Sequence, residues 1–187
     1  MSPNLKQQPK VIWFTGRPSA GKTTLALALY EALSDRGFVC RILDGDVLRD
    51  GLNSDLGFAP ADRIENIRRV AEVSKLFIET GLICINSFIS PTAKIRAMAQ
   101  QIIGSEHFIE VFVNAPASVC EKRDVKGMYK KARAGLITDF TGVSAPFDAP
   151  LNPDIELKTD LFTVEACIAK ALDTILPLIS VAPAIRH

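Results

Sequence analysis

The chain has 187 residues, of which 48% are hydrophobic and 23% charged, and its formal net charge is +1. This length and composition predict a single globular domain, residues 1–187, with one apolar core. The balanced charge argues against a protein that binds nucleic acid through its overall positive charge. No apolar run approaches the roughly 18 residues that span a membrane. Residues 1–10 lack the apolar core of a secretory signal, so we expect a cytoplasmic protein.

The first predicted strand, Val11–Phe14, leads into a complete GxxxxGK[ST] loop, and a helical pattern follows from Lys22 to Ser34. In such a loop backbone N–H groups face phosphate oxygens, the lysine reaches the terminal phosphates and the threonine hydroxyl binds Mg²⁺. The helix adds its positive N-terminal end. Because the required strand and helix flank the loop, a plain glycine turn is the weaker interpretation. The sequence predicts a nucleoside triphosphate site, which the family resemblance given below makes an ATP site, at Gly16, Arg17, Pro18, Ser19, Ala20, Gly21, Lys22, Thr23 and Thr24.

The second predicted strand, residues 39–43, ends in Asp44-Gly45-Asp46. Two carboxylates at the end of a strand can hold Mg²⁺ or take a proton from an attacking hydroxyl. A solvated Asp-Gly turn is the structural alternative, but the position opposite Lys22 favours function. The [NT]KxD pattern of guanine-specific GTPases and the signature of transporter ATPases are both missing from the sequence. We therefore expect a kinase-like site in which Thr23 and Asp44 bind Mg²⁺.

Strands and helices continue to alternate along the rest of the chain. Strands are predicted at 82–85, 108–113 and, more weakly, 155–157, and helices at 63–80, 92–103 and 163–179. This order indicates an α/β fold with a mainly parallel five-stranded sheet and helices on both faces. Right-handed crossovers place the ligand site at the carboxyl ends of the strands, where Gly16, Asp44 and Ser87 fall. Residues 1–9 and those after Pro183 are expected to be frayed ends.

Residues 124–153 interrupt this alternation with glycines and prolines, and they show at most one or two short helical turns. Segments this long without regular structure usually act as lids or binding loops. Residues 121–135 carry six basic side chains against two acidic ones. A solvated helix face explains such a charge run in isolation. Beside a phosphate loop we expect a mobile basic lid over a polyanionic substrate.

Longer strings identify the type of kinase. They are Gly51-Leu52-Asn53, Asp55-Leu56-Gly57-Phe58, Asp62-Arg63, Glu65-Asn66-Ile67-Arg68-Arg69, Ser87-Phe88-Ile89-Ser90-Pro91 and residues 120–127, 129–135 and 140–142. With the phosphate loop and the Asp-Gly-Asp turn, they make the chain similar to the adenylylsulfate kinase (APS kinase) family over residues 10–180. The resemblance implies a three-layer P-loop NTPase fold of the nucleotide-kinase type. It also implies Mg²⁺-dependent transfer of phosphate from ATP to the 3′-hydroxyl of adenosine 5′-phosphosulfate (APS), giving 3′-phosphoadenosine 5′-phosphosulfate (PAPS), by a homodimer.

The resemblance further implies how APS is bound. Arg49, Arg63 and Asn66 contact its phosphosulfate and ribose, while Phe58 and Phe147 sandwich its adenine. Guanidinium groups suit an anion of this kind and aromatic faces suit a purine, although ordinary core packing is the alternative for both phenylalanines. The remaining residues implied on the acceptor side are Asp44, Asp46, Ile89, Ser90, Lys126, Thr141 and Gly142.

The same resemblance implies catalytic roles for Lys22, Asp44 and Asp46, and places Arg123 on the ATP side. Asp46, or else Asp44, orients or deprotonates the acceptor hydroxyl. Ser90 matches the phosphoserine candidate of the family. Because in-line transfer needs positioning and charge neutralisation and no protein nucleophile, we expect no covalent step there.

Three positions depart from the family pattern. The phosphate loop reads Gly16-Arg17-Pro18 in place of Gly-Leu-Ser, which should leave ATP binding intact; Val47 stands in place of an asparagine, and Thr92-Ala93 replace an aromatic and an arginine. Because of Val47 and Thr92-Ala93, a related kinase with another nucleotide or small alcohol as acceptor is the alternative function. A nucleotide-binding regulatory module without turnover is a third hypothesis, but it requires Lys22 or the carboxylates to be missing.

Overall fold

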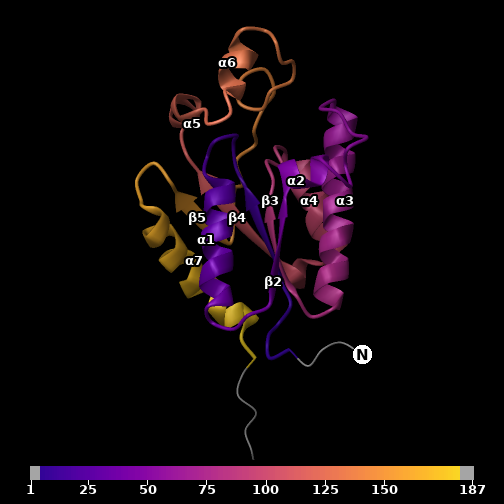
Figure 1. Cartoon of the computed structure of the whole chain (residues 1–187), viewed down its shortest axis with the longest axis vertical. Coiled ribbons are helices and arrows are strands. Elements are labelled where there is room, and N and C mark those ends of the chain that lie inside the picture. The colour runs from indigo at the N-terminus through magenta and orange to yellow at the C-terminus, as the bar shows by residue number, and fades with distance from the viewer. Residues whose placement is uncertain (1–4, 182–187) are drawn as a thin grey trace, which may run out of the picture.

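The computed structural model describes residues 5–181 and shows a central sheet between two layers of helices (Figure 1). The strands are β1 (Val11–Thr15), β2 (Cys40–Asp44), β3 (Ile83–Ser87), β4 (Phe108–Asn114) and β5 (Ile155–Lys158). The helices are α1 (Lys22–Ser34), α2 (Gly45–Arg49), α3 (Pro60–Glu79), α4 (Ala93–Ile103), α5 (Ala117–Arg123), α6 (Met128–Arg133) and α7 (Val164–Ile179), with a short 3₁₀ turn, η1 (Ser105–His107). No helix within these residues is long and apolar enough to cross a membrane.

All strand pairs in the sheet are parallel, in the order β2-β3-β1-β4-β5. The five predicted strands and four long predicted helices are confirmed, with shifts only at their ends. Helix α3 begins earlier than predicted because Pro60, whose fixed φ suits a first helical turn, occupies that turn. Since β1 lies in the middle, the carboxyl ends of β1, β2 and β3 meet beside the loop that follows β1.

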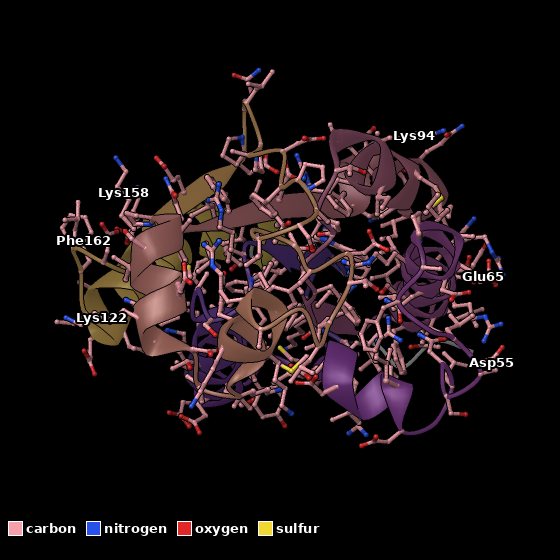
Figure 2. All side chains as sticks on the ribbon, turned by 90° about the horizontal axis from the view of Figure 1, so that it is seen from above. Asp55, Glu65, Lys94, Lys122, Lys158 and Phe162 are labelled. Atoms are coloured by element: carbon pink, nitrogen blue, oxygen red, sulfur yellow. The ribbon has the colours of Figure 1, made fainter. Side chains whose placement is uncertain are left out.

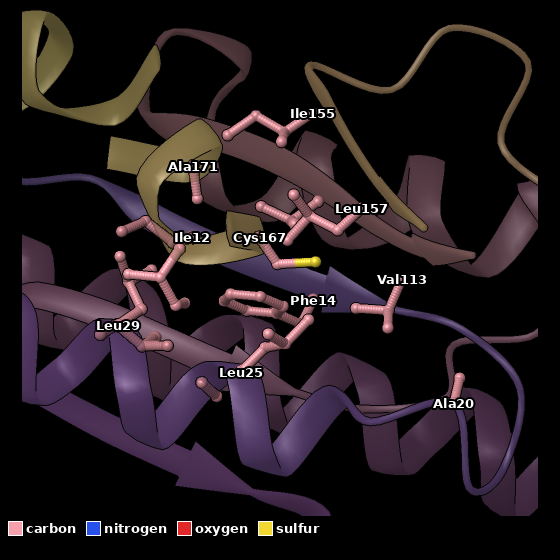
Figure 3. Packing of buried hydrophobic residues seen from close by; sticks show 14 of the residues in the cluster. Ile12, Phe14, Ala20, Leu25, Leu29, Val113, Ile155, Leu157, Cys167 and Ala171 are labelled. Carbon is pink, nitrogen blue, oxygen red and sulfur yellow. The ribbon is translucent and has the colours of Figure 1, made fainter. Parts of the chain in front are cut away.

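The core is split by the sheet because successive side chains of a strand point to opposite faces. From β1, Ile12 and Phe14 pack toward α1 and α7, where Figure 3 shows them with Leu25, Leu29 and Cys167. Val11 and Trp13 belong to the other cluster, which includes side chains of α3 and α4. Trp13 stacks between Phe88 and Phe108, with ring centroids 5.8 and 5.6 Å away. Each large side chain buried in this way contributes about 1.5–3 kcal/mol, which fixes the strand that carries the phosphate loop.

Two short helices, α2 and α5, are absent from the sequence prediction. Helix α2 replaces the simple Asp-Gly turn because the Asp44 carboxylate accepts a hydrogen bond from the Asp46 N–H at 3.0 Å and caps the helix. Helix α5 ends at Arg123, after which Asp124 takes a positive φ of 22°. Both helices flank the carboxyl edge of the sheet.

The prediction of a frayed start is wrong for part of residues 5–9. Gln7 is buried, and its amide donates to the carbonyls of Val39 and Gly81 at 2.9 and 2.8 Å while it accepts from the Val39 N–H. Gln8 donates its N–H to the Ile179 carbonyl at the end of α7. These bonds tie the segment to the amino-terminal edge of the sheet. Residues 1–4 and 182–187, and so the end predicted after Pro183, lie outside the described residues.

Residues 124–153, called the lid segment below, rise above the carboxyl edge of the sheet (Figure 1). The segment contains one short helix, α6, as the sequence indicates. Asp124 caps α6 by accepting from the N–H groups of Tyr129 and Lys130. Tyr129 is 1% exposed and packs edge-on against Phe140, with centroids 5.0 Å apart. Both side chains belong to the core cluster that includes Ile12 and Phe14, so the base of the lid segment is packed onto the domain.

Candidate active site

A cleft of about 950 Å³ opens at the carboxyl ends of the strands, a size that suits small-molecule substrates. Its walls come from the phosphate loop, α2, the acceptor loop (residues 87–91), the start of α3 and α7, and the lid segment. Figure 2 looks down onto this edge, with Phe162 and Asp55 on opposite sides of the molecule. Of the predicted site residues, the cleft is lined by Pro18, Ser19, Gly21, Lys22, Thr23, Thr24, Asp44, Asp46, Arg49, Phe58, Arg63, Asn66, Ile89, Ser90, Arg123, Lys126 and Thr141.

The phosphate loop is shaped by a close backbone contact at Gly16 and by left-handed backbone at Ser19 and Gly21. A Cβ on Gly16 would lie 2.6 Å from the Val113 carbonyl oxygen of β4, closer than real contacts allow. Gly21 has a φ of 106° and Ser19 a φ of 60°, both in the left-handed region. Ala20 is buried. The backbone therefore turns tightly ahead of α1, whose N-terminus begins at Lys22 and attracts anions.

Lys22 lies inside this turn. Its ammonium donates to the carbonyls of Gly16 and Arg17 at 3.1 and 2.8 Å, and its side chain is 9% exposed. Burial lowers the pKa of Lys22 to about 8, so the group is still mostly protonated at neutral pH. A partly desolvated cation held by the loop itself is suited to bind terminal phosphates.

Three side-chain oxygens gather at the mouth of the loop. The Thr23 hydroxyl donates to Asp44 Oδ2 at 2.9 Å and lies 3.2 Å from Ser87 Oγ. Hydroxyl and carboxylate oxygens are the ligands Mg²⁺ prefers, and in kinases it takes one or two carboxylates together with substrate phosphates. The residues present fit a magnesium ion.

Asp46 lies one residue into α2, beside this oxygen cluster. Its carboxylate forms an ion pair with Lys126 of the lid segment. Both side chains are exposed, at 70% for Asp46 and 62% for Lys126, so the pair is easily exchanged for other partners. The structure thus brings together two residues that are 80 positions apart in the chain.

The acceptor half of the cleft is lined by arginines held by backbone carbonyls. Arg49 donates to the Leu56 and Gly57 carbonyls at 3.0 Å, and its guanidinium lies 4.2 Å from the centre of the Phe58 ring. Arg63 donates to the Phe58 carbonyl at 2.9 Å. Burial lowers the pKa of both arginines. Two partly desolvated guanidinium groups beside one exposed aromatic ring can receive an anion attached to a purine.

Arg63 also contacts the lid segment. It donates to the Thr141 hydroxyl at 2.8 Å and to the Asp139 carbonyl. Asn66 accepts a hydrogen bond from Asn53 at 2.9 Å, and Asn53 is fully buried. The predicted acceptor residues of α3 and of the lid are therefore adjacent in the structure.

Phe147 lies outside the residues that line the cleft. Its ring stacks on Phe112 with centroids 6.1 Å apart, and the Arg17 guanidinium lies 5.0 Å from its centre. The structure therefore does not place Phe147 opposite Phe58. Arg17, one of the departures from the family pattern, instead contacts the lid segment through the Phe147 ring.

Ser90 is 1% exposed and has a positive φ of 38°. Its hydroxyl donates to Thr15 Oγ1 at 2.8 Å and accepts from the Trp13 indole N–H at 3.1 Å. Thr15 in turn donates to the Ile89 carbonyl at 2.8 Å. The Ser90 hydroxyl, enclosed in this way, is a structural group of the acceptor loop.

Gly142, at the far side of the phosphate loop, has a φ of 90° and lies near Arg17 and the Tyr129 hydroxyl.

Two residues that were not predicted as site residues, Thr159 and Tyr129, donate hydrogen bonds to carbonyls of the phosphate loop. Thr159, after β5, donates to the Ala20 carbonyl at 2.7 Å and accepts from Arg123 at 3.0 Å. Tyr129 donates to the Pro18 carbonyl at 3.1 Å. A single threonine and a single tyrosine carry no signal of their own, because their contacts link segments more than 100 residues apart. Both bonds join the phosphate loop to distant parts of the chain.

Comparison with known proteins agrees with this geometry. The family model for adenylylsulphate kinase matches residues 8–158. An adenylyl-sulfate kinase of Bacteroides fragilis is 54% identical over 176 residues, covering 94% of this chain and 87% of that protein. One from Clostridium kluyveri is 51% identical over 169 residues, covering 90% and 84%.

Solved structures give the same result. The Mycobacterium tuberculosis APS kinase in complex with AMPPNP and APS has a TM-score of 0.87 and 41% identity, covering 90% of this chain and 98% of that one. A sugar kinase from Janibacter, at 17% identity and a TM-score of 0.65, shares the fold alone. The described sheet, phosphate loop and cleft, together with these matches, show that the chain belongs to the adenylylsulfate kinase family.

Proposed function

We propose that the protein transfers the γ-phosphoryl group of ATP to the 3′-hydroxyl of APS, producing PAPS and ADP. The observation that carries this proposal is a single cleft in which the phosphate loop faces Arg49, Arg63 and Phe58. Support comes from the relative solved with AMPPNP and APS, which is 41% identical over 90% of the chain. The departures at Val47 and Thr92 leave this cleft intact: Val47 is 69% exposed, and Thr92 caps α4 by accepting from the Ile95 N–H.

On the donor side, residues 16–24 bind the phosphates of ATP through backbone N–H groups and the N-terminus of α1. Lys22 contacts the terminal phosphates. Arg123, which donates to the Ala20 and Thr159 carbonyls, adds positive charge at the same loop. Thr23 and Asp44 hold Mg²⁺, and the ion, when bound, neutralises charge on the phosphate oxygens.

On the acceptor side, Arg49, Arg63 and Asn66 bind the phosphosulfate and ribose of APS, and Phe58 stacks on its adenine. Ile89, Ser90 and Thr141 complete the wall of the cleft, and Gly142 follows Thr141 outside the lining. If Phe147 forms the second face of an adenine sandwich, its ring must leave Phe112, because the two rings are stacked in the structure described here. Closure of the lid segment provides this movement and excludes water from the γ-phosphoryl group.

For the transfer step, Asp46 orients the 3′-hydroxyl and accepts its proton as the new P–O bond forms. Lys126, now paired with Asp46, shifts toward the acceptor phosphosulfate. The positive charges of Lys22 and Arg123 offset the charge that develops on the transferred group. No phosphoserine forms on Ser90, because its hydroxyl is 1% exposed and held by Trp13 and Thr15.

We also propose that the protein is a cytoplasmic homodimer. The outer edge of β2 is unpaired within the described sheet. Leu27, Tyr30 and Val39 are partly exposed apolar residues on α1 and just before β2, so a surface for a second copy exists near this edge. Light scattering of the purified protein at micromolar concentration tests the assembly, and a monomeric mass contradicts it.

The function is tested by chromatography of reactions that contain purified protein, Mg²⁺ and ATP, with APS present or omitted. Product with the retention time of PAPS is expected only when APS is present. Parallel reactions with adenosine 5′-monophosphate and with small alcohols test the alternative acceptor. Phosphorylation of one of these, without PAPS from APS, contradicts the proposal.

A further inference from the structure

The acceptor loop contains a strained residue that is fixed from several sides. Ser90 has a φ of 38° although it has a Cβ, a conformation that costs on the order of 1 kcal/mol or more and persists only where surrounding contacts enforce it. Among the described residues, the N–H groups of Ile89 and Ser90 donate to no backbone carbonyl. Both residues line the cleft. The strained conformation therefore lies in the wall of the acceptor half.

Arg96 of α4 holds this conformation from behind. Its guanidinium donates to the Ser90 carbonyl at 3.1 Å and pairs with Glu110 of β4 at 2.9 Å. The Arg96 side chain is 6% exposed and that of Glu110 18%, so both contacts are largely shielded from water. One side of the planar guanidinium is paired with Glu110 of the central sheet, and the other donates to the Ser90 carbonyl of the acceptor loop.

Stability alone does not explain a buried ion pair at this position. Desolvation offsets most of the attraction between such charges, and apolar residues of similar volume often stabilise a fold as well or better. What the pair supplies and apolar residues do not is a directed donor for the Ser90 carbonyl. The neighbouring backbone is tied in as well, because Asp148 of the lid segment donates its N–H to the Pro91 carbonyl and accepts from the Ala93 N–H.

We propose that Arg96, oriented by Glu110, is a positioning residue for acceptor binding: through the Ser90 carbonyl it fixes the acceptor loop in the conformation that receives the nucleotide acceptor. Arg96 touches no substrate. Its effect is confined to the acceptor half, because the phosphate loop is anchored by Thr159, Tyr129 and the backbone of β4. The inference rests on the proposed function.

The decisive variant is Arg96→Met/Glu110→Leu, which removes both charges and keeps an apolar filling. The KM for APS should rise about tenfold, the scale of one lost charge-assisted hydrogen bond, while the KM for ATP and the melting temperature stay at the wild-type values. The control Arg68→Ala/Glu72→Ala removes an exposed ion pair of α3 and should change none of the three. An unchanged KM for APS in a folded double variant overturns the proposal, and so does an equal rise for both substrates.

Two further measurements keep the test independent of folding and of turnover. Arg96→Lys retains a buried cation without the planar guanidinium, and a KM for APS about threefold above wild type is expected. A wild-type KM for APS contradicts the role.

Trp13 is the single tryptophan and donates to Ser90 Oγ, so its emission should shift in the double variant and stay unchanged in the control. Unaltered emission overturns the proposal. If wild-type protein makes no PAPS, the proposed function fails, whereas the Trp13 comparison still reports whether Arg96 fixes the loop.

Discussion

The phosphate-loop half of the cleft is held by backbone and buried groups, whereas the acceptor half combines a buried acceptor loop, held by Arg96, with charged side chains that reach the lid. In the first half, Gly16 abuts β4 and Thr159 donates to the Ala20 carbonyl. In the second, Asp46 pairs with Lys126, and Arg63 with Thr141. Exposed pairs contribute little to stability and exchange readily. The donor half is therefore preformed, whereas in the acceptor half the contacts with the lid can rearrange around the ligand while the loop held by Arg96 stays in place.

The largest effect is expected from Asp46→Asn, which removes the carboxylate proposed to take the proton. The turnover number should fall by about 10²–10⁴, the usual contribution of a general base, with the melting temperature unchanged because Asp46 is 70% exposed. Steady-state kinetics and thermal unfolding measure both. Lys126→Met is the comparison for turnover only: it breaks the same ion pair and leaves the carboxylate, so its effect should fall on the KM for APS. Turnover close to wild type in Asp46→Asn would remove Asp46 from the mechanism.

Two exposed phenylalanines at opposite ends of the cleft sharpen the comparison. Phe58 is 57% exposed and Phe162 58%. Phe58→Ala should raise the KM for APS about 10- to 100-fold, which corresponds to the loss of base stacking, without changing the KM for ATP. Phe162→Ala is the matched control and should leave the KM for APS as it is. Equal effects of both variants on APS would show that the two halves are not separate.

The pKa of Lys22 gives a smaller effect, which depends on pH. Burial lowers this pKa to about 8, and the phosphates of ATP favour the protonated ammonium. As pH rises through about 8, free protein loses the proton that the complex keeps, so affinity for ATP should fall about tenfold by roughly pH 9.

Calorimetry in buffers of different ionisation enthalpy measures the linked proton. At about pH 8.5 ATP binding should take up a proton, and at about pH 6.5 it should take up almost none through this group. Lys22→Arg keeps the charge at both values and should abolish the difference. Proton uptake that persists in Lys22→Arg would assign it to another residue.

The smallest effect is expected where the lid meets the donor half. Tyr129→Phe removes one hydrogen bond to the Pro18 carbonyl, worth about 0.5–1.5 kcal/mol, so the lid should close less firmly. Hydrolysis of ATP without APS should rise about twofold to threefold. Tyr30→Phe, which changes the other tyrosine of the chain, is the control. A phosphate-release assay that shows no difference between the two variants would separate this bond from lid closure.

The donor half could be predicted from the sequence because its chemistry is encoded locally. A strand, a glycine loop and a helix in succession define residues 16–24, and the alternation of strands and helices defines the sheet. The sequence did not predict helix α2, because Asp44-Gly45 also fits the pattern of a simple turn. The Tyr129 and Thr159 contacts join distant segments, as does the Arg96 pair with Glu110, and a single chain carries no local pattern for such links. Phe147 shows the limit of resemblance, since motif matching does not give the position of a lid side chain.

Phosphoryl transfer from ATP to APS can be followed directly by ³¹P NMR of ATP, Mg²⁺, APS and purified protein over time. One 3′-phosphate of PAPS should appear for each ADP formed, and ATP should stay stable when APS is omitted, because the acceptor completes the closed site. Accumulation of ADP and inorganic phosphate without a 3′-phosphate signal would contradict this transfer.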